Sequence, residues 1–241
     1  MSFHSRLKMH PLFSYCLPPE ALIPSHPAFS LFCGMQNIQA IIFDLGGVIL
    51  NIDYRRTEKA LRHLGLSHFQ GLFYQQEAGQ LLCDLETGKI TGLDFVKALQ
   101  KESVKSLRIS EIMDAWNAML LDFPPERIEL LRKLIKKYPV YLLSNTNPIH
   151  VEAFNNILKD QHGIDSLEPL FTKAYFSHDI RARKPDEEAF LQVIRENNLD
   201  PATTLFIDDT EANTEAARKA GLQAILLTPP TTIIDLKELQ D

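Results

Sequence analysis

The sequence predicts an α/β protein with a doubly wound parallel sheet, into which a helical subdomain is inserted. The first observation is a set of short apolar runs, rich in β-branched residues, that are typical of strands buried on both faces. The second is that, from residue 124 onward, these runs alternate with helical segments at the spacing of βαβ units. The third is the stretch 54–123, which shows helical periodicity and no convincing strand.

The first apolar run, residues 38–43, ends at Asp44, and the glycines Gly46 and Gly47 follow it closely. A glycine pair after a strand indicates a sharp turn or a close approach of the backbone to a bound group. Asp44 is therefore expected at the carboxyl end of a central strand, where open α/β sheets bind their ligands. The local sequence fits equally well an aspartate that only caps the following turn.

Residues 1–34 differ from the rest of the chain, because their prolines interrupt any helix and their aromatic residues follow no period. They also lack the sustained apolar stretch of a signal peptide. Every later element is complete without them, so we expect a poorly ordered extension. The predicted α/β core comprises residues 35–53 and 124–241, and the helical subdomain comprises residues 54–123.

Periodicity and capping signals predict the individual elements. The helices of the subdomain are expected over residues 54–64 and 70–84, after the capping box of Thr91 and Asp94, and from Ser110. The helices of the core are expected over residues 125–138, from Pro148, over 186–197 and over 211–220. The strands after the first are expected at residues 139–143, 174–176, 204–207 and 224–227.

Composition and charge exclude several classes of protein. The 241 residues are 45% hydrophobic and 23% charged, as in an ordinary globular protein. The net charge of −6 argues against nucleic acid as the main partner, and no apolar run is long enough to cross a bilayer. Cys16, Cys33 and Cys83 are too widely spaced for a thiolate metal site or a disulfide framework, which fits the reducing cytoplasm. We therefore predict a cytoplasmic protein that acts on a small molecule, with no nucleic-acid or membrane partner and no indication of its oligomeric state.

Polar side chains gather at the ends of the predicted strands, which share one edge of a parallel sheet. They are Asp44, Ser144, Asn145, Asp208 and Asp209, together with Lys184 in a loop after another strand. Converging carboxylates repel each other unless a cation lies among them, and oxygen ligands favour Mg²⁺. A lysine offsets the charge of a bound dianion, and a serine hydroxyl binds phosphoryl oxygens. This combination indicates phosphoryl transfer.

Four short motifs carry a resemblance to a known family. They are FDLGGV at residues 43–48, LSNTN at 143–147, RKPD at 183–186 and FIDD at 206–209. With these motifs in this order, the chain resembles the haloacid dehalogenase (HAD) superfamily, on the side of its phosphatases with a helical cap after the first motif. The forms FDLGGV and LSNTN resemble most closely its sugar-phosphate (glucose-1-phosphate) phosphatases. The resemblance implies a Rossmann-like core and a cap formed by residues 54–123.

The resemblance also implies roles for the matched residues. Asp44 would attack phosphorus and form an aspartyl phosphate, which water then hydrolyses. Ser144 would hydrogen-bond the transferring group, with Asn145 beside it at the substrate, and Lys184 would bridge the nucleophile and the phosphate. The implied activity is hydrolysis of a small phosphorylated metabolite, such as a sugar phosphate.

A Mg²⁺ ion is the cofactor that the resemblance implies. Its protein ligands would be Asp44, Asp208 and the main-chain carbonyl of Gly46, and Asp209 would support the metal or its waters. A carbonyl ligand survives any change of side chain at its position, so the glycine at position 46 leaves this metal site intact.

The sequence departs from the family pattern at Gly46, where most phosphatases of the superfamily have an aspartate that acts as general acid and base. A positioned proton donor is typically worth about 10²–10⁴-fold in rate, so its absence should penalise substrates with poor leaving groups. Anomeric sugar phosphates have an easier leaving group. Metal-bound water and Asp53 are candidate replacements, although we expect Asp53 to cap the first helix of the cap. A second departure is Arg181, where relatives carry glycine and where we expect an exposed side chain.

Two other functions are compatible with the same fold. A haloacid-type dehalogenase would use the Asp44 nucleophile on carbon and needs no metal, which leaves the adjacent carboxylates of Asp208 and Asp209 without a purpose. A catalytically silent regulatory protein is favoured only by Gly46, and the presence of Asp44, Ser144 and Lys184 together argues against it.

Overall fold

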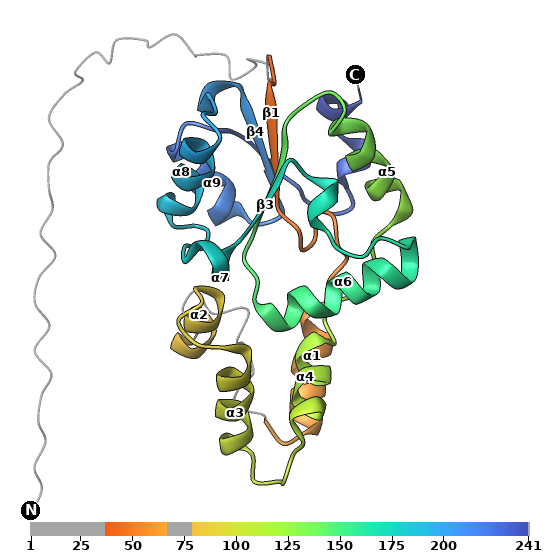
Figure 1. Ribbon diagram of the computed structural model, residues 1–241, viewed down its shortest axis with the longest axis vertical. Helices are drawn as coiled ribbons and strands as arrows, with labels where there is room; N and C mark the ends of the chain where they lie inside the picture. The colour runs from red at the N-terminus through yellow and green to blue at the C-terminus, as the bar shows by residue number, and fades with distance from the viewer. Residues whose placement is uncertain (1–36, 67–78, 241) are drawn as a thin grey trace, which may run out of the picture. The chain divides into compact units, whose positions relative to one another are not determined.

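The computed structural model describes residues 37–66 and 79–240, which belong to one compact unit of residues 35–241. In this part of the chain the strands form one parallel five-stranded sheet in the order β3-β2-β1-β4-β5 (Figure 1). The strands are β1 (Ala40–Phe43), β2 (Val140–Ser144), β3 (Lys173–Phe176), β4 (Thr204–Asp208) and β5 (Gln223–Leu226). The predicted α/β class is confirmed. The expected extension 1–34 and most of the predicted helix 70–84 lie outside the described residues.

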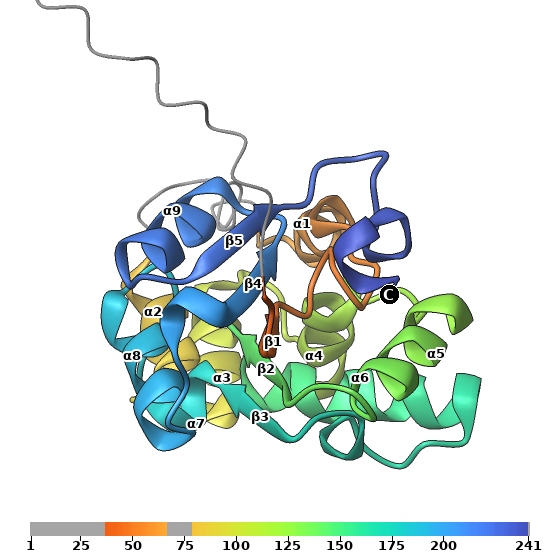
Figure 2. The same ribbon diagram turned by 90° about the horizontal axis from the view of Figure 1, so that it is seen from above.

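Helices cover both faces of the sheet, and this explains why the inner strands are apolar throughout. Figure 2 shows α5 (Pro125–Leu134) and α6 (Pro148–His162) on one side and α8 (Glu187–Glu196) and α9 (Glu211–Lys219) on the other. Successive residues of a strand point to opposite faces. Accordingly, Ile41 belongs to the core under α5 and α6, and Ile42 belongs to the core under α8 and α9.

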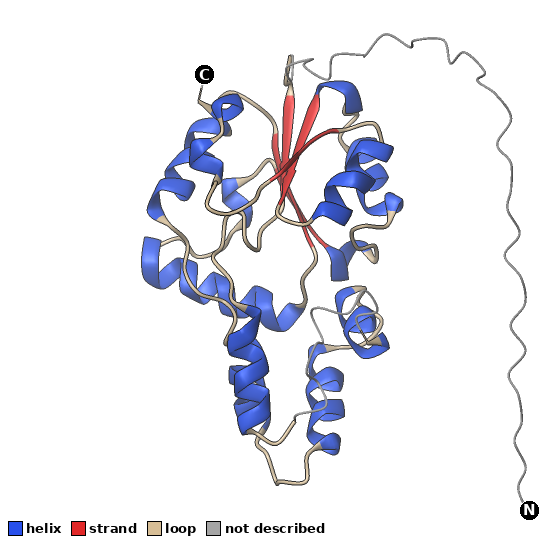
Figure 3. Cartoon of the chain, turned by 180° about the vertical axis from the view of Figure 1, so that it is seen from behind, coloured by secondary structure: helices blue, strands red, loops and turns tan. Residues whose placement is uncertain are grey.

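Helices α1 (Tyr54–His63), α2 (Gln80–Glu86), α3 (Gly92–Glu102) and α4 (Ile109–Asn117) lie beyond one end of the strands (Figure 3). They pack around a separate apolar cluster that includes Leu85, Phe95 and Trp116. The predicted capping box is present, since Thr91 Oγ1 accepts a hydrogen bond from the Asp94 amide at 3.1 Å. We retain as a proposal the assignment of residues 54–123 to a cap domain.

The loop expected after β3 contains a single helical turn, α7 (Ser177–Ile180), which ends at Arg181. Arg181 adopts the left-handed conformation with φ +56°, a conformation that glycine adopts most easily, and its side chain is exposed as expected. Short 3₁₀ turns occur at Glu168–Leu170, Pro201–Thr203, Ile233–Asp235 and Lys237–Leu239. Across the described ranges, no helix combines the length and the apolar character that crossing a bilayer requires.

Trp116 and His150 join the helical cluster to α6. Trp116 is fully buried and stacks on His150, with ring centroids 5.1 Å apart. The Nε2 atom of His150 lies 3.3 Å from the Trp116 carbonyl oxygen, to which an Nε2–H donates. Burial lowers the pKa of His150 to about 4, against a smaller opposite effect of this hydrogen bond. Both residues are therefore part of the core, and His150 is kept neutral.

The buried His150 predicts a dependence of stability on pH. Between its unfolded pKa near 6.5 and its folded pKa near 4, the unfolded chain binds the extra proton. We therefore expect the free energy of unfolding to decrease as the pH is lowered through this window, by up to about 3 kcal/mol from this residue. The variant His150→Phe keeps a ring against Trp116 and should lose this part of the slope in urea titrations. His63→Gln, at an exposed site, is the control, and an unchanged slope in His150→Phe would contradict the assignment.

Candidate active site

Neighbouring strands bring the predicted residues to one edge of the sheet. Phe43 is paired with Ile207, so the residues that follow, Asp44 and Asp208, lie side by side at the ends of β1 and β4. The Asp44 amide fixes this register by donating to the Ile207 carbonyl at 2.9 Å. On the other side of β1, β2 ends at Ser144, which is buried. Parallel pairing thus places Asp44 between the other two strand ends.

Lys184 lies between the two aspartates. Its Nζ donates to Asp44 Oδ1 at 2.6 Å and to Asp208 Oδ2 at 2.7 Å, and the residue is 1% exposed. Burial lowers the pKa of Lys184, but the negative charges of Asp208 and Asp44 outweigh this effect and the pKa is raised. The lysine is therefore a permanent positive charge in the centre of the site.

Asn145 holds the main chain of Lys184. Its Nδ2 donates to the Lys184 carbonyl at 2.8 Å, and its Oδ1 accepts from the Lys184 amide at 2.9 Å. Because both ends of the amide are engaged in this way, the side chain positions the lysine. The predicted contact of Asn145 with substrate stays a prediction. The loop after Ser144 is held in turn by Ser177, whose Oγ bonds the amide and the carbonyl of Thr146 at 3.0 Å each.

Asp44 is a buried carboxylate in a crowded electrostatic environment. Burial raises its pKa to about 7; Lys184 acts in the opposite direction, and the charges of Asp208 and Asp209 add to the increase. Asp208 is fully buried and is held by Asn213, whose Nδ2 donates to its carboxylate oxygens at 3.1 and 3.0 Å. The Thr210 amide donates to Asp208 Oδ1 at 2.8 Å. Asn213 therefore orients Asp208.

Among the described residues, Asp44, Asp208 and Asp209 form a group that could hold a cation, with one carboxylate oxygen from each within 4.8 Å of the others. Hard oxygen ligands at this separation fit Mg²⁺. Asp209 was expected to support the metal or its waters, and one of its carboxylate oxygens lies within 4.8 Å of those of Asp44 and Asp208. A ligand role for the Gly46 carbonyl stays a prediction.

The two glycines in the loop after Asp44 differ in how much room a side chain would have. Gly47 has φ +76°, and a Cβ at this position would lie 2.0 Å from Asp209 Oδ2, so a side chain here would displace Asp209. At Gly46, a Cβ would lie 3.0 Å from Cδ1 of Ile52. The side chain of Ile52 thus packs close to the space in which a residue at position 46 would extend.

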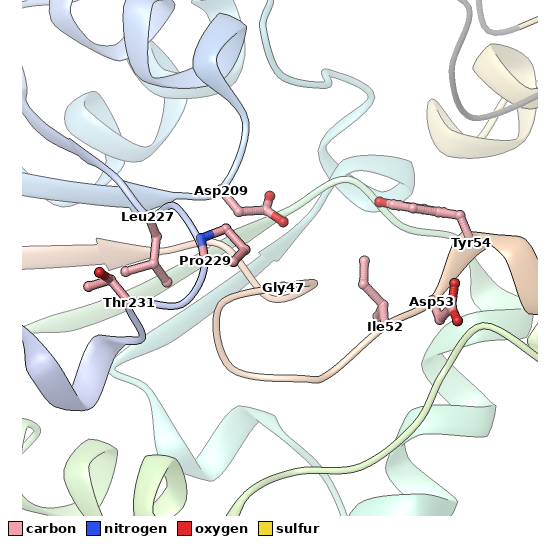
Figure 4. Close-up of a pocket in the computed structure, with 8 residues that line it drawn as sticks. All are labelled: Gly47, Ile52, Asp53, Tyr54, Asp209, Leu227, Pro229 and Thr231. Carbon is pink, nitrogen blue, oxygen red and sulfur yellow. The ribbon is translucent and has the colours of Figure 1, made fainter.

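A pocket of about 320 Å³ opens beside Asp209. Its lining residues come from the loop after β1, the start of α1, the end of β4 and the loop after β5. Figure 4 shows them: Gly47, Ile52, Asp53, Tyr54, Asp209, Leu227, Pro229 and Thr231. Asp53 caps α1 as expected, and its carboxylate accepts from the Arg55 amide at 3.1 Å and from Arg55 Nε at 2.9 Å. This wall of the pocket is therefore built by the first turn of the helical segment.

Helix α2 also reaches the loop that carries Lys184. Glu86, at the end of α2, forms an ion pair with Arg183, with 2.8 Å between Oε2 and Nη2. Burial raises the pKa of Glu86, and the charge of Arg183 opposes the increase. Gly88, with φ +65°, lies against the His178 carbonyl so closely that a Cβ would be 2.2 Å from this oxygen. Sequence reasoning missed the ion pair of Glu86 with Arg183, because no local pattern pairs two residues that are 97 positions apart.

Comparison with known families agrees with the motifs. The model of the haloacid dehalogenase-like hydrolases matches residues 38–221, which is most of the chain. The chain belongs to this family of hydrolases. The resemblance drawn from the four motifs and the prediction of a hydrolytic enzyme are thereby confirmed.

Individual relatives are similar over most of their length. The chain is 30% identical over 186 residues to D-ribitol-5-phosphate phosphatase of Bacteroides thetaiotaomicron, and this aligned region covers 77% of this chain and 90% of the relative. It is 24% identical over 204 residues to a phosphorylated carbohydrates phosphatase of Thermotoga maritima. Here the aligned region covers 78% of this chain and 84% of the relative. A HAD family enzyme of B. thetaiotaomicron, solved in complex with magnesium and inorganic phosphate, has a TM-score of 0.76 at 32% identity and covers 85% of this chain and 100% of its own.

Proposed function

We propose that the chain is a Mg²⁺-dependent phosphatase that hydrolyses a small phosphorylated carbohydrate through an aspartyl phosphate on Asp44. The observation that carries the proposal is the buried Lys184, which contacts Asp44 and Asp208 beside a cluster of three carboxylates. Asp44 thus lies next to a fixed positive charge and within a possible cation site. This arrangement suits the transfer of a dianionic group, for which positioning and charge stabilisation are the main requirements.

Each residue has a distinct task in this reaction. An oxygen of Asp44 attacks phosphorus, the bond from phosphorus to the sugar oxygen breaks, and the sugar oxygen takes a proton. Water then attacks the aspartyl phosphate and releases inorganic phosphate, which restores the Asp44 carboxylate. Lys184 holds Asp44 in place and offsets the charge of the phosphoryl group, to which Ser144 donates a hydrogen bond. A Mg²⁺ ion held by Asp44, Asp208, Asp209 and the Gly46 carbonyl would add positive charge at the phosphoryl oxygens.

The substrate class rests on the relatives and on the site together. Two relatives carry names that refer to phosphorylated sugars or sugar alcohols. The pocket beside Asp209 has both polar and apolar walls, which suits a hydroxylated carbon chain. The adjacent carboxylates disfavour the dehalogenase alternative, since a metal-independent reaction has no use for their mutual repulsion.

A substrate screen tests the proposal. Sugar phosphates, sugar-alcohol phosphates, nucleotides and phosphorylated acids are offered to the full chain, with Mg²⁺ and with a chelator, and released phosphate is measured. We expect hydrolysis of the carbohydrate esters that is lost with the chelator and restored by added Mg²⁺. Halide release from haloacids that is insensitive to the chelator would favour a dehalogenase. Normal Mg²⁺ binding without hydrolysis of any ester would favour a silent regulatory protein.

A further inference from the structure

One end of the pocket beside Asp209 lies close to the carboxylate that is proposed as the nucleophile. Gly47 and Asp209 both line this end, and a Cβ at Gly47 would lie 2.0 Å from Asp209 Oδ2. A carboxylate oxygen of Asp209 in turn lies within 4.8 Å of one from Asp44. A substrate whose phosphate reaches Asp44 therefore has its ester carbon at this end of the pocket.

The side chain of Ile52 forms an apolar wall at the same end. A Cβ at Gly46, two residues after Asp44, would lie 3.0 Å from Ile52 Cδ1 and 3.8 Å from Ile52 Cγ2. Ile52 also lines the pocket, and in Figure 4 its side chain points away from the main chain and into it. The Cδ1 methyl group thus fills space between the turn after Asp44 and the interior of the pocket.

The backbone of Ile52 is held by a short antiparallel pairing. Ile52 pairs with Leu120 in an antiparallel bridge. Two main-chain hydrogen bonds flank this bridge, from the Leu121 amide to the Asn51 carbonyl at 3.0 Å and from the Asp53 amide to the Met119 carbonyl at 2.9 Å. The branched Cβ of isoleucine further restricts its χ1 angle. The position of the methyl group is therefore fixed by paired backbone on both sides.

A fixed methyl group beside the ester carbon limits the shape of the substrate at this point. The pocket encloses about 320 Å³, which is near the lower end for a ligand site. A primary ester carbon carries one carbon branch and two hydrogen atoms, whereas a ring carbon carries two branches. In an apolar pocket one additional methylene group changes kcat/KM by about 10- to 200-fold. The ester of a ring carbon is therefore the one that this wall opposes.

We propose that Ile52 is a specificity-determining residue, which favours phosphate esters of primary carbons over those of ring carbons. The inference rests on the proposed phosphatase function and narrows its substrate class to carbohydrates phosphorylated at the end of the carbon chain. Anomeric sugar phosphates have an easier leaving group, but they need the space that the Cδ1 methyl group fills. Ile52 thus acts through shape and takes no part in the making or breaking of bonds.

The test compares two isomers, ribose 5-phosphate and ribose 1-phosphate, in the variants Ile52→Val and Ile52→Ala. Ile52→Val removes only the Cδ1 carbon and keeps the branched Cβ, so the main-chain pairing should be retained. We expect the ratio of kcat/KM for the 1-phosphate to that for the 5-phosphate to rise about 10-fold in Ile52→Val, and further in Ile52→Ala. The intrinsic reactivity of the two esters is the same with every variant, so it cancels when the ratios are compared.

The matched control is Leu120→Val. It also removes one carbon from the same antiparallel pair, but from a residue outside the pocket lining, so the ratio should not change. A merely structural role of Ile52 would lower both rates together, and thermal unfolding of all variants measures that effect. An unchanged or lower ratio in the Ile52 variants, or an equal rise in Leu120→Val, would overturn the inference. Hydrolysis of the 1-phosphate alone by the unmodified chain would overturn it as well.

Failure of the proposed function gives a different result. If the unmodified chain hydrolyses no ester in the substrate screen, the phosphatase proposal itself fails. If it hydrolyses other carbohydrate esters, but neither it nor the Ile52 variants hydrolyse either ribose isomer, only the role of Ile52 is refuted.

Discussion

Asp44→Asn is expected to lower kcat by at least about 10⁴-fold, because an amide cannot replace the carboxylate as the nucleophile. The substitution changes shape very little. Lys184 keeps its hydrogen bond to Asp208 at 2.7 Å, so the site retains a neutralised lysine and the chain should remain folded. The loss is then a loss of chemistry, which steady-state phosphate release and thermal unfolding can separate.

The intermediate gives a second readout for Asp44. Acid quenching of the unmodified chain during turnover should trap a species that is heavier by one phosphoryl group, and peptide mapping should locate it at Asp44. Asp53→Asn is the matched control, since asparagine caps a helix as well as aspartate does and the fold should tolerate the change. A fully active Asp44→Asn variant, or a phosphoryl group found at another residue, would refute Asp44 as the nucleophile.

Lys184→Met is expected to have the second largest effect, on stability as well as on rate. Methionine has a similar length but no charge, so the buried carboxylates of Asp44 and Asp208 lose their shared partner. Removing one member of a buried charge pair typically costs about 3–5 kcal/mol of unfolding free energy. Denaturant unfolding in a chelator should show a decrease of this size, and phosphate release should fall by at least about 10²-fold.

Added Mg²⁺ separates this explanation from simple loss of packing. A cation at Asp44, Asp208 and Asp209 replaces part of the missing positive charge, so Mg²⁺ should restore stability more in Lys184→Met than in the unmodified chain. Lys173→Met is the control, because its exposed ion pair with Glu196 is worth at most about 1 kcal/mol. An equal response to Mg²⁺ in both variants would contradict the proposed cation site.

The arrangement of the core could be predicted from sequence because it depends on local and repetitive signals. Apolar runs that alternate with helices require a parallel sheet, and a parallel sheet brings its strand ends together. For this reason Asp44, Lys184 and Asp208 could be expected to meet, although they lie far apart in the sequence, and the structure brings them into contact. Their chemical roles remain proposals that the two variants above address.

Other contacts could not be predicted, because they depend on how distant segments fold back on each other. The pairing of Glu86 with Arg183 joins the end of one helix to a loop 97 residues later, and no pattern in either segment indicates it. The hydrogen bonds of Asn145 to the backbone of Lys184 have no local signal either, because the two residues are 39 positions apart.

The packing of Ile52 near Gly46 has a consequence for how such a site can change over evolutionary time. An aspartate introduced at position 46 would bring its Cβ to 3.0 Å from Ile52 Cδ1, so the isoleucine would have to shift by a few tenths of an ångström. The effect of a substitution at position 46 therefore depends on the residue at position 52, and the two positions are epistatic. An acidic side chain at position 46 would therefore be accommodated more easily in a background where residue 52 is smaller.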